Sequence, residues 1–180
     1  MNLNLAVIGL SLFEFVLTAA LSVLVVYVNY RLLIVTNRDY DAEEEIKKDN
    51  KGVAMLLAGL VIAGGLIVRE GIYPVMNIVR LYFTTPQPEF AGWQMLLLAA
   101  GHVVLVFVIA TFTLSLSLRF WGKLTPHVQN GEELKRGNFS VGIVLTGVVL
   151  VVAMFMSEGI SRLTKSLIPQ PSMGQVEFAD

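Results

Sequence analysis

The second half of this chain repeats its first half in register, 88 residues later. Residues 45–72 align without a gap to residues 133–160, and 10 of the 28 aligned positions are identical. Most of the other pairs exchange one apolar residue for another. Because a long repeat in an apolar chain is typical of two units packed about a pseudo-symmetry axis, we predict two related units, 1–88 and 89–168. A frayed tail is expected at 169–180.

Four apolar blocks divide the chain, at residues 5–34, 53–68, 93–120 and 141–156. The chain is 55% hydrophobic and 15% charged, whereas a soluble domain carries about 25% charged residues. About 20 helical residues cross the roughly 30 Å apolar core of a bilayer, and the two shorter blocks reach that length if their helices continue outward. We therefore predict an all-α, polytopic membrane protein with four transmembrane helices, built from two parallel two-helix repeats.

Basic residues predict which side of the membrane each loop faces. The loops after the first and third spans hold nine Lys and Arg residues, while the middle loop and the tail hold four. Since basic-rich short loops stay in the cytoplasm, we expect both termini outside the cytoplasm and both units inserted in the same sense. The first apolar run follows no basic residue and is longer than the apolar core of a signal peptide, so we interpret it as a retained span.

The composition excludes several kinds of site. The chain has no cysteine, which excludes disulfides and zinc–thiolate sites. Its few basic residues are scattered over loops, which argues against nucleic-acid binding. It has no glycine-rich phosphate loop, nucleophile elbow or paired-histidine motif. We therefore expect no enzymatic activity, no cofactor and no metal site.

A short charged helix is predicted before the second span and before the fourth. Residues 41–48 and 130–136 place acidic residues early and basic residues late, which suits the helix dipole. Each segment begins with a short polar residue and has Glu three positions later, the spacing of a capping box. Two interpretations stay open, a solvated surface helix and a docking face for a cytoplasmic protein. The docking candidates are Glu45, Lys47, Lys48, Glu133, Lys135 and Arg136.

Asparagine marks the point where each charged helix meets its span. Asn50 and Asn138 occupy equivalent positions there, and Asn caps helix starts well. We expect a kink or a new helix start at both positions. The alternative is that the two side chains line the cytoplasmic mouth of a polar path.

Small residues at intervals of four characterise the second and fourth spans. Such residues let helix backbones approach closely in lipid. We therefore expect these two spans at the centre of the molecule or at an oligomer contact, with the first and third spans facing lipid. The packing candidates are Ala54, Ala58, Gly59, Ala63, Gly142, Thr146 and Gly147.

The middle loop contains three prolines, and between Pro74 and Pro86 the residues Val75, Val79 and Tyr82 share one helical face. This pattern predicts a short helix that lies in the outer membrane interface. In the third span, hydroxyl residues form two pairs one turn apart, Thr111 with Ser115 and Thr113 with Ser117. Such hydroxyls bond their own backbone, cross to a neighbouring helix or line a wet path.

Four ionisable residues are predicted to lie at one level of the membrane: Glu14, Glu70, His102 and Glu158. Glu14 and His102 each lie 17 residues before an arginine, and Glu70 and Glu158 each lie 20 residues after an asparagine. At about 1.5 Å per residue, all four fall near the outer edge of the hydrocarbon layer, where a charge requires a reason. One interpretation is neutralisation by nearby arginines. The other is a cluster that binds a cation or passes protons, with His102 as its proton-responsive member.

The two charged segments resemble a known family. In residues 45–59 and 133–147, a charged helix, an asparagine and an apolar span with small residues follow in the same order. This order is similar to that of the YjfL-like bacterial inner-membrane proteins, whose unit is a two-span domain of unknown function, number three hundred and fifty, usually present in tandem. The resemblance extends to about Leu167, although Asp49 stands where the second unit has Gly137.

The resemblance implies location and topology rather than activity. It implies four spans in the bacterial cytoplasmic (inner) membrane. The family has no established activity, so it assigns no catalytic residue to this chain. As a group, such proteins are loosely linked to envelope stress and to genes for membrane-associated or polyamine-related proteins.

Two functions follow as hypotheses from the sequence. The first, slightly favoured, is a channel or transporter for protons or small cations that uses the outer Glu and His residues. Because four spans can hardly enclose a wide pore, conduction requires a homo-oligomer. The second is a non-transporting scaffold in the lipid bilayer that recruits a cytoplasmic partner through the charged helices.

Overall fold

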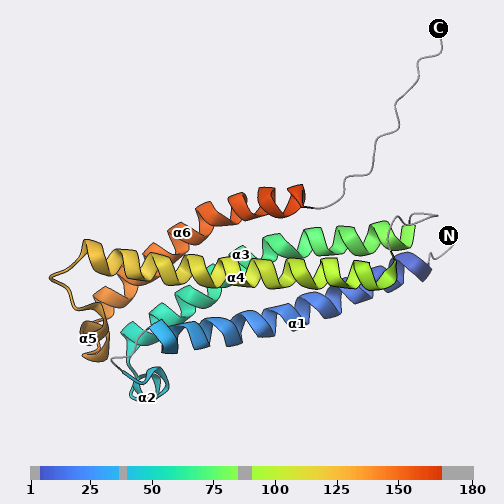
Figure 1. Cartoon of the computed structure of the whole chain (residues 1–180). Helices are drawn as coiled ribbons and strands as arrows, with labels where there is room; N and C mark the ends of the chain where they lie inside the picture. The colour runs from blue at the N-terminus through green and yellow to red at the C-terminus, as the bar shows by residue number, and fades with distance from the viewer. Residues whose placement is uncertain (1–4, 37–39, 85–90, 168–180) are drawn as a thin grey trace, which may run out of the picture.

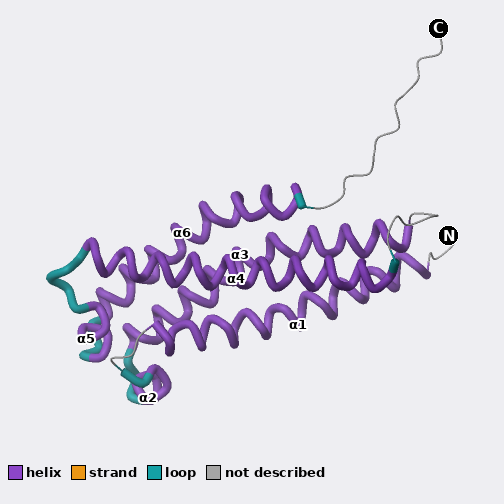
Figure 2. The backbone as a smooth tube through the Cα atoms, in the orientation of Figure 1, coloured by secondary structure: helices purple, strands orange, loops and turns teal. Residues whose placement is uncertain are grey.

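The computed structural model describes residues 5–36, 40–84 and 91–167. These residues form four long helices and two short ones. The long helices lie side by side, and the short helices lie at one end of the bundle (Figures 1 and 2). The long helices alternate in direction, so that α1 and α4 run one way and α3 and α6 the other. The helices are α1 (Leu5–Thr36), α2 (Ala42–Lys47), α3 (Lys51–Thr84), α4 (Gly92–Leu124), α5 (Asn130–Lys135) and α6 (Phe139–Ser166).

The four long helices are each long and apolar enough to cross a membrane, with mean hydropathy between 2.1 and 2.6 over their spans. This result confirms the predicted all-α fold with four spans. The two shorter apolar blocks reach spanning length because α3 continues through Gly71 and α6 continues through Gly159. The predicted tail, residues 169–180, lies outside the described residues, and so does most of the predicted boundary between the two units.

The predicted interfacial helix of the middle loop is instead the end of a span. Helix α3 runs unbroken through Pro74 to Thr84. A proline is tolerated inside a membrane helix when its neighbours satisfy the freed backbone groups. The face that was expected to lie on the membrane surface packs inside the bundle, where Val79 and Ile78 contact Met95 of α4 in a small apolar cluster.

Helix α3 is the centre of the bundle. Half of its apolar span is buried (50%), compared with 6% for α1 and 22% for each of α4 and α6. It packs against α1, α4 and α6, and most extensively against α6. Its buried face carries Val53, Leu56, Leu60 and Ile67, which join the main apolar core. The other three long helices therefore surround α3 and expose most of their own apolar surface.

A close contact joins the N-terminal parts of α3 and α6. A Cβ atom built on Gly142 would lie 2.5 Å from the carbonyl oxygen of Gly52, and one built on Gly59 would lie 2.6 Å from Cγ2 of Thr146. The Thr146 hydroxyl also donates a hydrogen bond of 2.9 Å to the carbonyl oxygen of Met55. Only glycine permits backbones to come this close, which is the packing mode typical of helices in lipid.

The seven small residues predicted to pack helices divide into two groups. A step of one residue turns about 100° around a helix, so adjacent small residues face different neighbours. Four of them are buried within the bundle: Gly59, Ala63, Gly142 and Thr146. Three are exposed and lie outside the α3–α6 contact: Ala54, Ala58 and Gly147.

Replacing Gly142 by alanine is expected to lower the free energy of unfolding by about 1–3 kcal/mol, because the added methyl group overpacks the backbone of Gly52. The matched control is Gly147→Ala, whose Cβ would meet nothing within 4 Å. This control should be neutral or stabilising by up to about 1 kcal/mol, since alanine is the better helix former. Circular dichroism during an SDS titration of the micellar protein measures both. Equal losses in the two variants would contradict the contact.

Candidate functional site

The three glutamates of the predicted polar cluster each have an arginine partner. Glu14 of α1 pairs with Arg80 of α3 at 3.5 Å between Oε2 and Nη2. The other two pairs form within one helix, Glu70 with Arg69 at 3.2 Å and Glu158 with Arg162 at 2.6 Å. Among the described residues no three His, Asp or Glu side chains are arranged to hold a metal ion. The geometry of the glutamates therefore matches the neutralisation interpretation.

His102 differs from the three glutamates because it is buried and only partly satisfied. Its side chain lies on α4 and the residue is 7% exposed. Nδ1 lies 2.8 Å from the carbonyl oxygen of Leu98, so the proton of the neutral ring belongs on Nδ1 and Nε2 is left as an acceptor. Nε2 is buried and has no hydrogen-bond partner among the described residues.

The two hydroxyl pairs of α4 face different surroundings. Thr113 and Ser117 are buried in the bundle, and the Ser117 hydroxyl donates 2.8 Å to the carbonyl oxygen of Leu114. Thr111 and Ser115 instead line an apolar groove between α1 and α4. Ser117 therefore bonds its own helix, as one of the sequence interpretations predicted.

Both short helices end in the same backbone turn. Asp49 and Gly137, which follow α2 and α5, have positive φ angles of 61° and 81°. The next residue returns its N–H to a carbonyl oxygen five residues back, at 3.0 Å from Asn50 to Glu45 and 2.9 Å from Asn138 to Glu133. These bonds define a Schellman-type helix end. The equivalent segments of the sequence repeat thus form junctions of the same local geometry.

The same two asparagines open the following spans. Asn50 Oδ1 accepts from the N–H of Val53 at 3.2 Å, and Asn138 Oδ1 accepts from the N–H of Val141 at 3.4 Å. The prediction of a new helix start at both positions is confirmed, since α3 begins at Lys51 and α6 at Phe139. Capping accounts for the oxygen atom of both side chains.

The start of α2 follows the capping prediction and the start of α5 does not. Asp41 Oδ1 accepts from the backbone N–H groups of Glu43 and Glu44, at 2.9 and 3.3 Å. Helix α5 begins one residue earlier than expected, with Gln129 at the N-cap and no side-chain cap bond. Asn130, which the capping prediction placed at the N-cap, is therefore the first residue of α5 instead.

Asn50 joins three helices. Its Nδ2 donates to Glu45 Oε2 at 2.9 Å and to the carbonyl oxygen of Leu134 in α5 at 2.7 Å. Among the described residues, Asn138 Nδ2 donates to Glu133 Oε2 alone, at 2.7 Å. Asn50 is buried, at 7% exposed, whereas Asn138 is half-buried. The side chains predicted to line a cytoplasmic mouth are thus engaged in helix caps and helix junctions.

The hydrogen bond from Asn50 is the main cause that lowers the pKa of Glu45 below its ordinary value of 4.5. Desolvation opposes this effect, and the nearby charges of Lys48 and Lys135 add to it. Because the folded pKa is depressed, ionised Glu45 stabilises the fold at neutral pH. That contribution is lost as the pH falls through the folded pKa.

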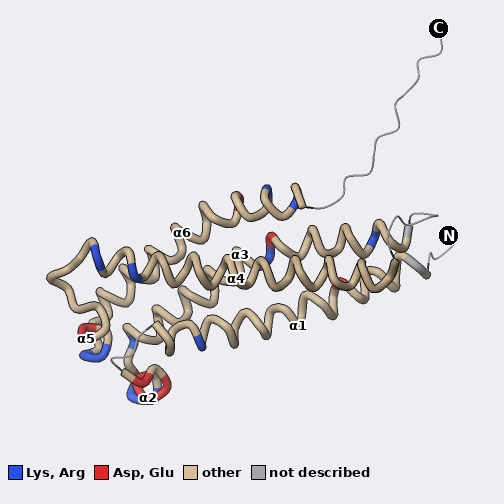
Figure 3. The backbone as a smooth tube through the Cα atoms, in the orientation of Figure 1, with Lys and Arg blue, Asp and Glu red and all other residues tan. Residues whose placement is uncertain are grey.

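The remaining docking candidates lie on the exposed side of the short helices. Lys47 pairs with Glu43 at 2.8 Å, and Lys48 pairs with Glu44 at 2.7 Å. Lys135 and Arg136 are exposed on α5. Figure 3 shows that acidic and basic residues gather at this end of the bundle on α2 and α5. Glu45 and Glu133 belong to the junctions instead, where their carboxylates accept from asparagine.

Asn29 is one of the buried polar residues that the sequence analysis did not single out. Asn29 of α1 is buried, and its Nδ2 donates 2.9 Å to the carbonyl oxygen of Val25. Its amide lies directly against Gly64 of α3, where any Cβ would clash with it. The available signal was a polar residue inside an apolar run, but the facing glycine follows only from the packing of α1 on α3.

Asn50→Ala is expected to destabilise the protein more than Asn138→Ala, by about 1–2 kcal/mol, because it also removes the buried hydrogen bond that links the start of α3 to the Leu134 carbonyl oxygen of α5. The difference in free energy of unfolding between wild type and Asn50→Ala should shrink as the pH falls through the depressed pKa of Glu45. Once Glu45 is protonated in both proteins, its ionised carboxylate no longer contributes to the difference. SDS unfolding followed by circular dichroism as a function of pH measures both effects. Equal losses in the two variants at neutral pH would contradict the triple role of Asn50.

Comparison with known proteins gives one family match. Neither the curated proteins nor the solved structures provide a significant match to the chain. The family match spans residues 94–176, which include nearly all of α4 and the whole of α5 and α6. Residues 1–93 lie outside it, so the tandem arrangement stays a prediction. This second half of the chain matches the family described as Domain of Unknown Function (DUF350), as the sequence resemblance predicted.

Proposed function

We propose that the protein is a membrane-anchored docking platform, in which α2 and α5 present one charged surface to a soluble protein partner. We call this surface the platform and define it by the exposed side chains of Glu43, Glu44, Lys47, Lys48, Glu132, Lys135 and Arg136. The observation that supports the proposal is the fixed attachment of two short charged helices to the bundle and to each other. The proposed role is not enzymatic.

The attachment is what distinguishes the platform from ordinary solvated loops. A helix of six residues is unstable alone in water, because its nucleation cost is not recovered. Here α2 is capped by Asp41 at its start and closed by the turn at Asp49. Asn50 then links α2 to α5 through Leu134. The platform is therefore ordered before any partner arrives, which removes an entropic cost of binding.

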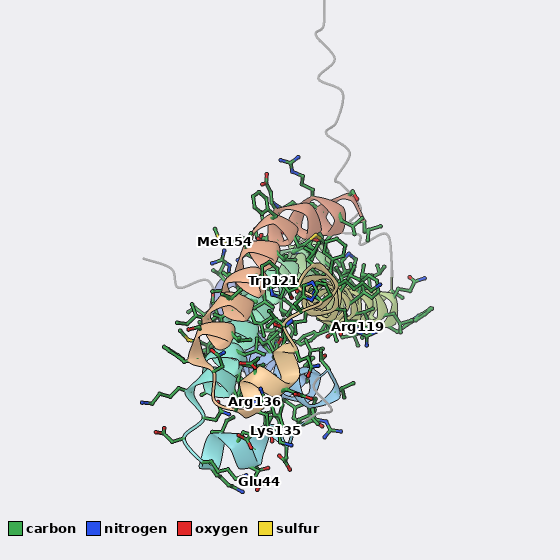
Figure 4. The ribbon with its side chains drawn as sticks, turned by 90° about the vertical axis from the view of Figure 1, so that its left-hand side faces the viewer. Glu44, Arg119, Trp121, Lys135, Arg136 and Met154 are labelled. Atoms are coloured by element: carbon green, nitrogen blue, oxygen red, sulfur yellow. The ribbon has the colours of Figure 1, made fainter. Side chains whose placement is uncertain are left out.

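The charges of the platform are available to a partner. Lys47, Lys48 and Arg136 pair with glutamates of the same short segment, in pairs such as Lys47 with Glu43 and Arg136 with Glu132. Exposed pairs of this kind contribute only about 0–1 kcal/mol, so a partner with complementary charges can replace them at little cost. Figure 4 shows Glu44, Lys135 and Arg136 at the same end of the bundle, contributed by both short helices. Such surfaces also speed association through electrostatic steering.

The platform lies on the side of the membrane that the distribution of basic residues predicts to be cytoplasmic. The partner is therefore expected to be a cytoplasmic protein that presents both acidic and basic side chains. The family resemblance connects such membrane proteins with envelope stress, which makes a stress-related partner the first class to test.

Reversing two platform charges with Lys47→Glu and Lys48→Glu is expected to lower partner recovery about tenfold in crosslinking pull-downs from membrane vesicles. The matched control is Arg162→Glu with Lys165→Glu, which makes the same charge change near the end of α6 far from α2 and α5. The control should recover the partner at the wild-type level. Helix content measured by circular dichroism checks that both variants fold. Equal recovery from both variants would refute the docking proposal.

A second candidate function rests on His102. A buried imidazole whose Nε2 has no partner among the described residues is able to accept a proton from a neighbouring copy or from water that enters the bundle. In this alternative, an oligomer moves protons or small cations and uses Glu70 and Glu158 at the same predicted level. The core of a single chain is filled by Leu, Val and Ile side chains, so a path would have to run between copies.

Proton flux into liposomes separates the two candidates. The second candidate expects flux above that of empty liposomes, and expects His102→Phe, or Glu70→Gln combined with Glu158→Gln, to reduce it at least tenfold. The transport hypothesis would be refuted if the wild-type protein showed no flux, or if the variants left the flux unchanged. If the protein acts only as a docking platform, we expect no flux above that of empty liposomes. Ser157→Ala, near Glu158 on α6, is a control that keeps every ionisable group.

A further inference from the structure

An apolar groove runs along the outer face of the bundle between α1 and α4. Its volume is about 650 Å³, within the range of roughly 300–1,000 Å³ found for small-molecule sites. Leu24 and Val28 form the α1 wall, and the α4 wall extends from Val103 to Arg119. At about 1.5 Å per residue, this wall is roughly 24 Å long. The groove is therefore elongated along α4, which suits an extended hydrocarbon chain.

Polar groups occur along the groove without partners of their own. The hydroxyls of Thr111 and Ser115 line it, and neither hydroxyl forms a hydrogen bond in the described part of the chain. Arg119 closes the same wall one turn beyond Ser115. Across residues 5–36, 40–84 and 91–167, Arg119 forms no ion pair or side-chain hydrogen bond. The permanently charged guanidinium of Arg119 thus lies at one end of the apolar groove without an ion-pair partner among the described residues.

A second arginine lies toward the same end of the groove. Arg31 of α1 follows Leu24 by seven residues, which places it on the face of α1 that lines the groove, two turns closer to the short helices. Arg31 is exposed and also has no ion pair among the described residues. Arg119 of the α4 wall and Arg31, on the same face of α1 as Leu24, therefore lie toward the end of the groove nearest to α2 and α5.

Arg119 lies five residues before the end of α4 at Leu124, roughly 8 Å along the helix. From that depth a long arginine side chain reaches the headgroup region while its stem stays among apolar groups. Figure 4 shows Arg119 at the outer edge of the bundle, on the side away from Met154. Guanidinium groups bind phosphate oxygens in a bidentate manner, so the end of the groove is suited to a phosphate.

We infer that this groove binds one acidic glycerophospholipid, with an acyl chain between α1 and α4 and its phosphate on Arg119, assisted by Arg31. The apolar walls match the chain, the hydroxyls match the polar glycerol region nearest the headgroup, and the two arginines match the negative charge. A second copy of this protein is a poorer occupant. A two-fold symmetric contact through this face would bring the arginines of both copies together.

Native mass spectrometry of the full chain tests the site, with phosphatidylglycerol and phosphatidylcholine added to the micelles as competing probes. The wild type should retain about one phosphatidylglycerol per chain in strong preference to phosphatidylcholine. Arg119→Gln should lower this retention about tenfold, which corresponds to roughly 1.4 kcal/mol. The matched control is Lys51→Gln, which removes an exposed basic charge at the same end of the bundle but outside the groove. It should bind like the wild type.

A second pair of variants tests the apolar part. Val108→Trp fills the groove and should abolish lipid retention, while Val151→Trp, at an exposed position on α6 outside the groove, should not. The inference is overturned if the wild type retains both lipids equally, or if each control behaves like its groove variant. It is also overturned if the spectra show a lipid-free dimer that Val108→Trp dissociates. Because bound lipid is the readout, the result does not depend on the docking proposal.

Discussion

The close contact between α3 and α6 is the constraint on which the rest of this structure depends. In lipid, apolar surface gains nothing by leaving the solvent, so helices associate through tight packing and hydrogen bonds. The contact at Gly52 and Gly142 brings the starts of the two spans together, and a Cβ on Gly52 would lie only 2.9 Å from the carbonyl oxygen of Asn138. This proximity lets Asn50 reach Leu134 at 2.7 Å. The glycines therefore determine where the short helices stand.

Local features of the fold could be predicted from the sequence because their causes are local. Apolar length predicted the four spans, the order of acidic and basic residues predicted α2 and α5, and asparagine predicted the new helix starts. The features that depend on tertiary packing could not be predicted in this way. Helix α3 passes through Pro74, and its part beyond that proline packs against Met95 of α4. Ala54 and Ala58 are the repeat counterparts of Gly142 and Thr146, yet only the latter pair is buried. Helix α3 packs against all three other long helices, whereas α6 packs mainly against α3.

The same distinction between local features and features that depend on tertiary packing applies to the candidate site. Counting residues along a span gives the height of a side chain but not the direction in which it points. The Glu158–Arg162 pair is four residues apart and was readable as a helical ion pair. The Glu14–Arg80 pair joins residues 66 apart on two helices, and only the packing of α1 against α3 creates it. The burial of His102 likewise depends on how α4 is rotated against the core, which no residue count supplies.

The groove between α1 and α4 is lined by residues that correspond to each other in the sequence repeat. Its walls include residues at the repeat spacing, since Leu24 and Val28 correspond to Phe112 and Leu116, and all four line it. On α4, small or β-branched side chains recur at positions 104, 108, 111 and 115, the spacing of one helix face. In α3 and α6 a comparable stripe is filled by the facing helix. On α4 the stripe stays open because α1 contacts this helix only slightly. Something apolar must fill it in a bilayer, and the two unpaired arginines at its end favour an occupant with an anionic head.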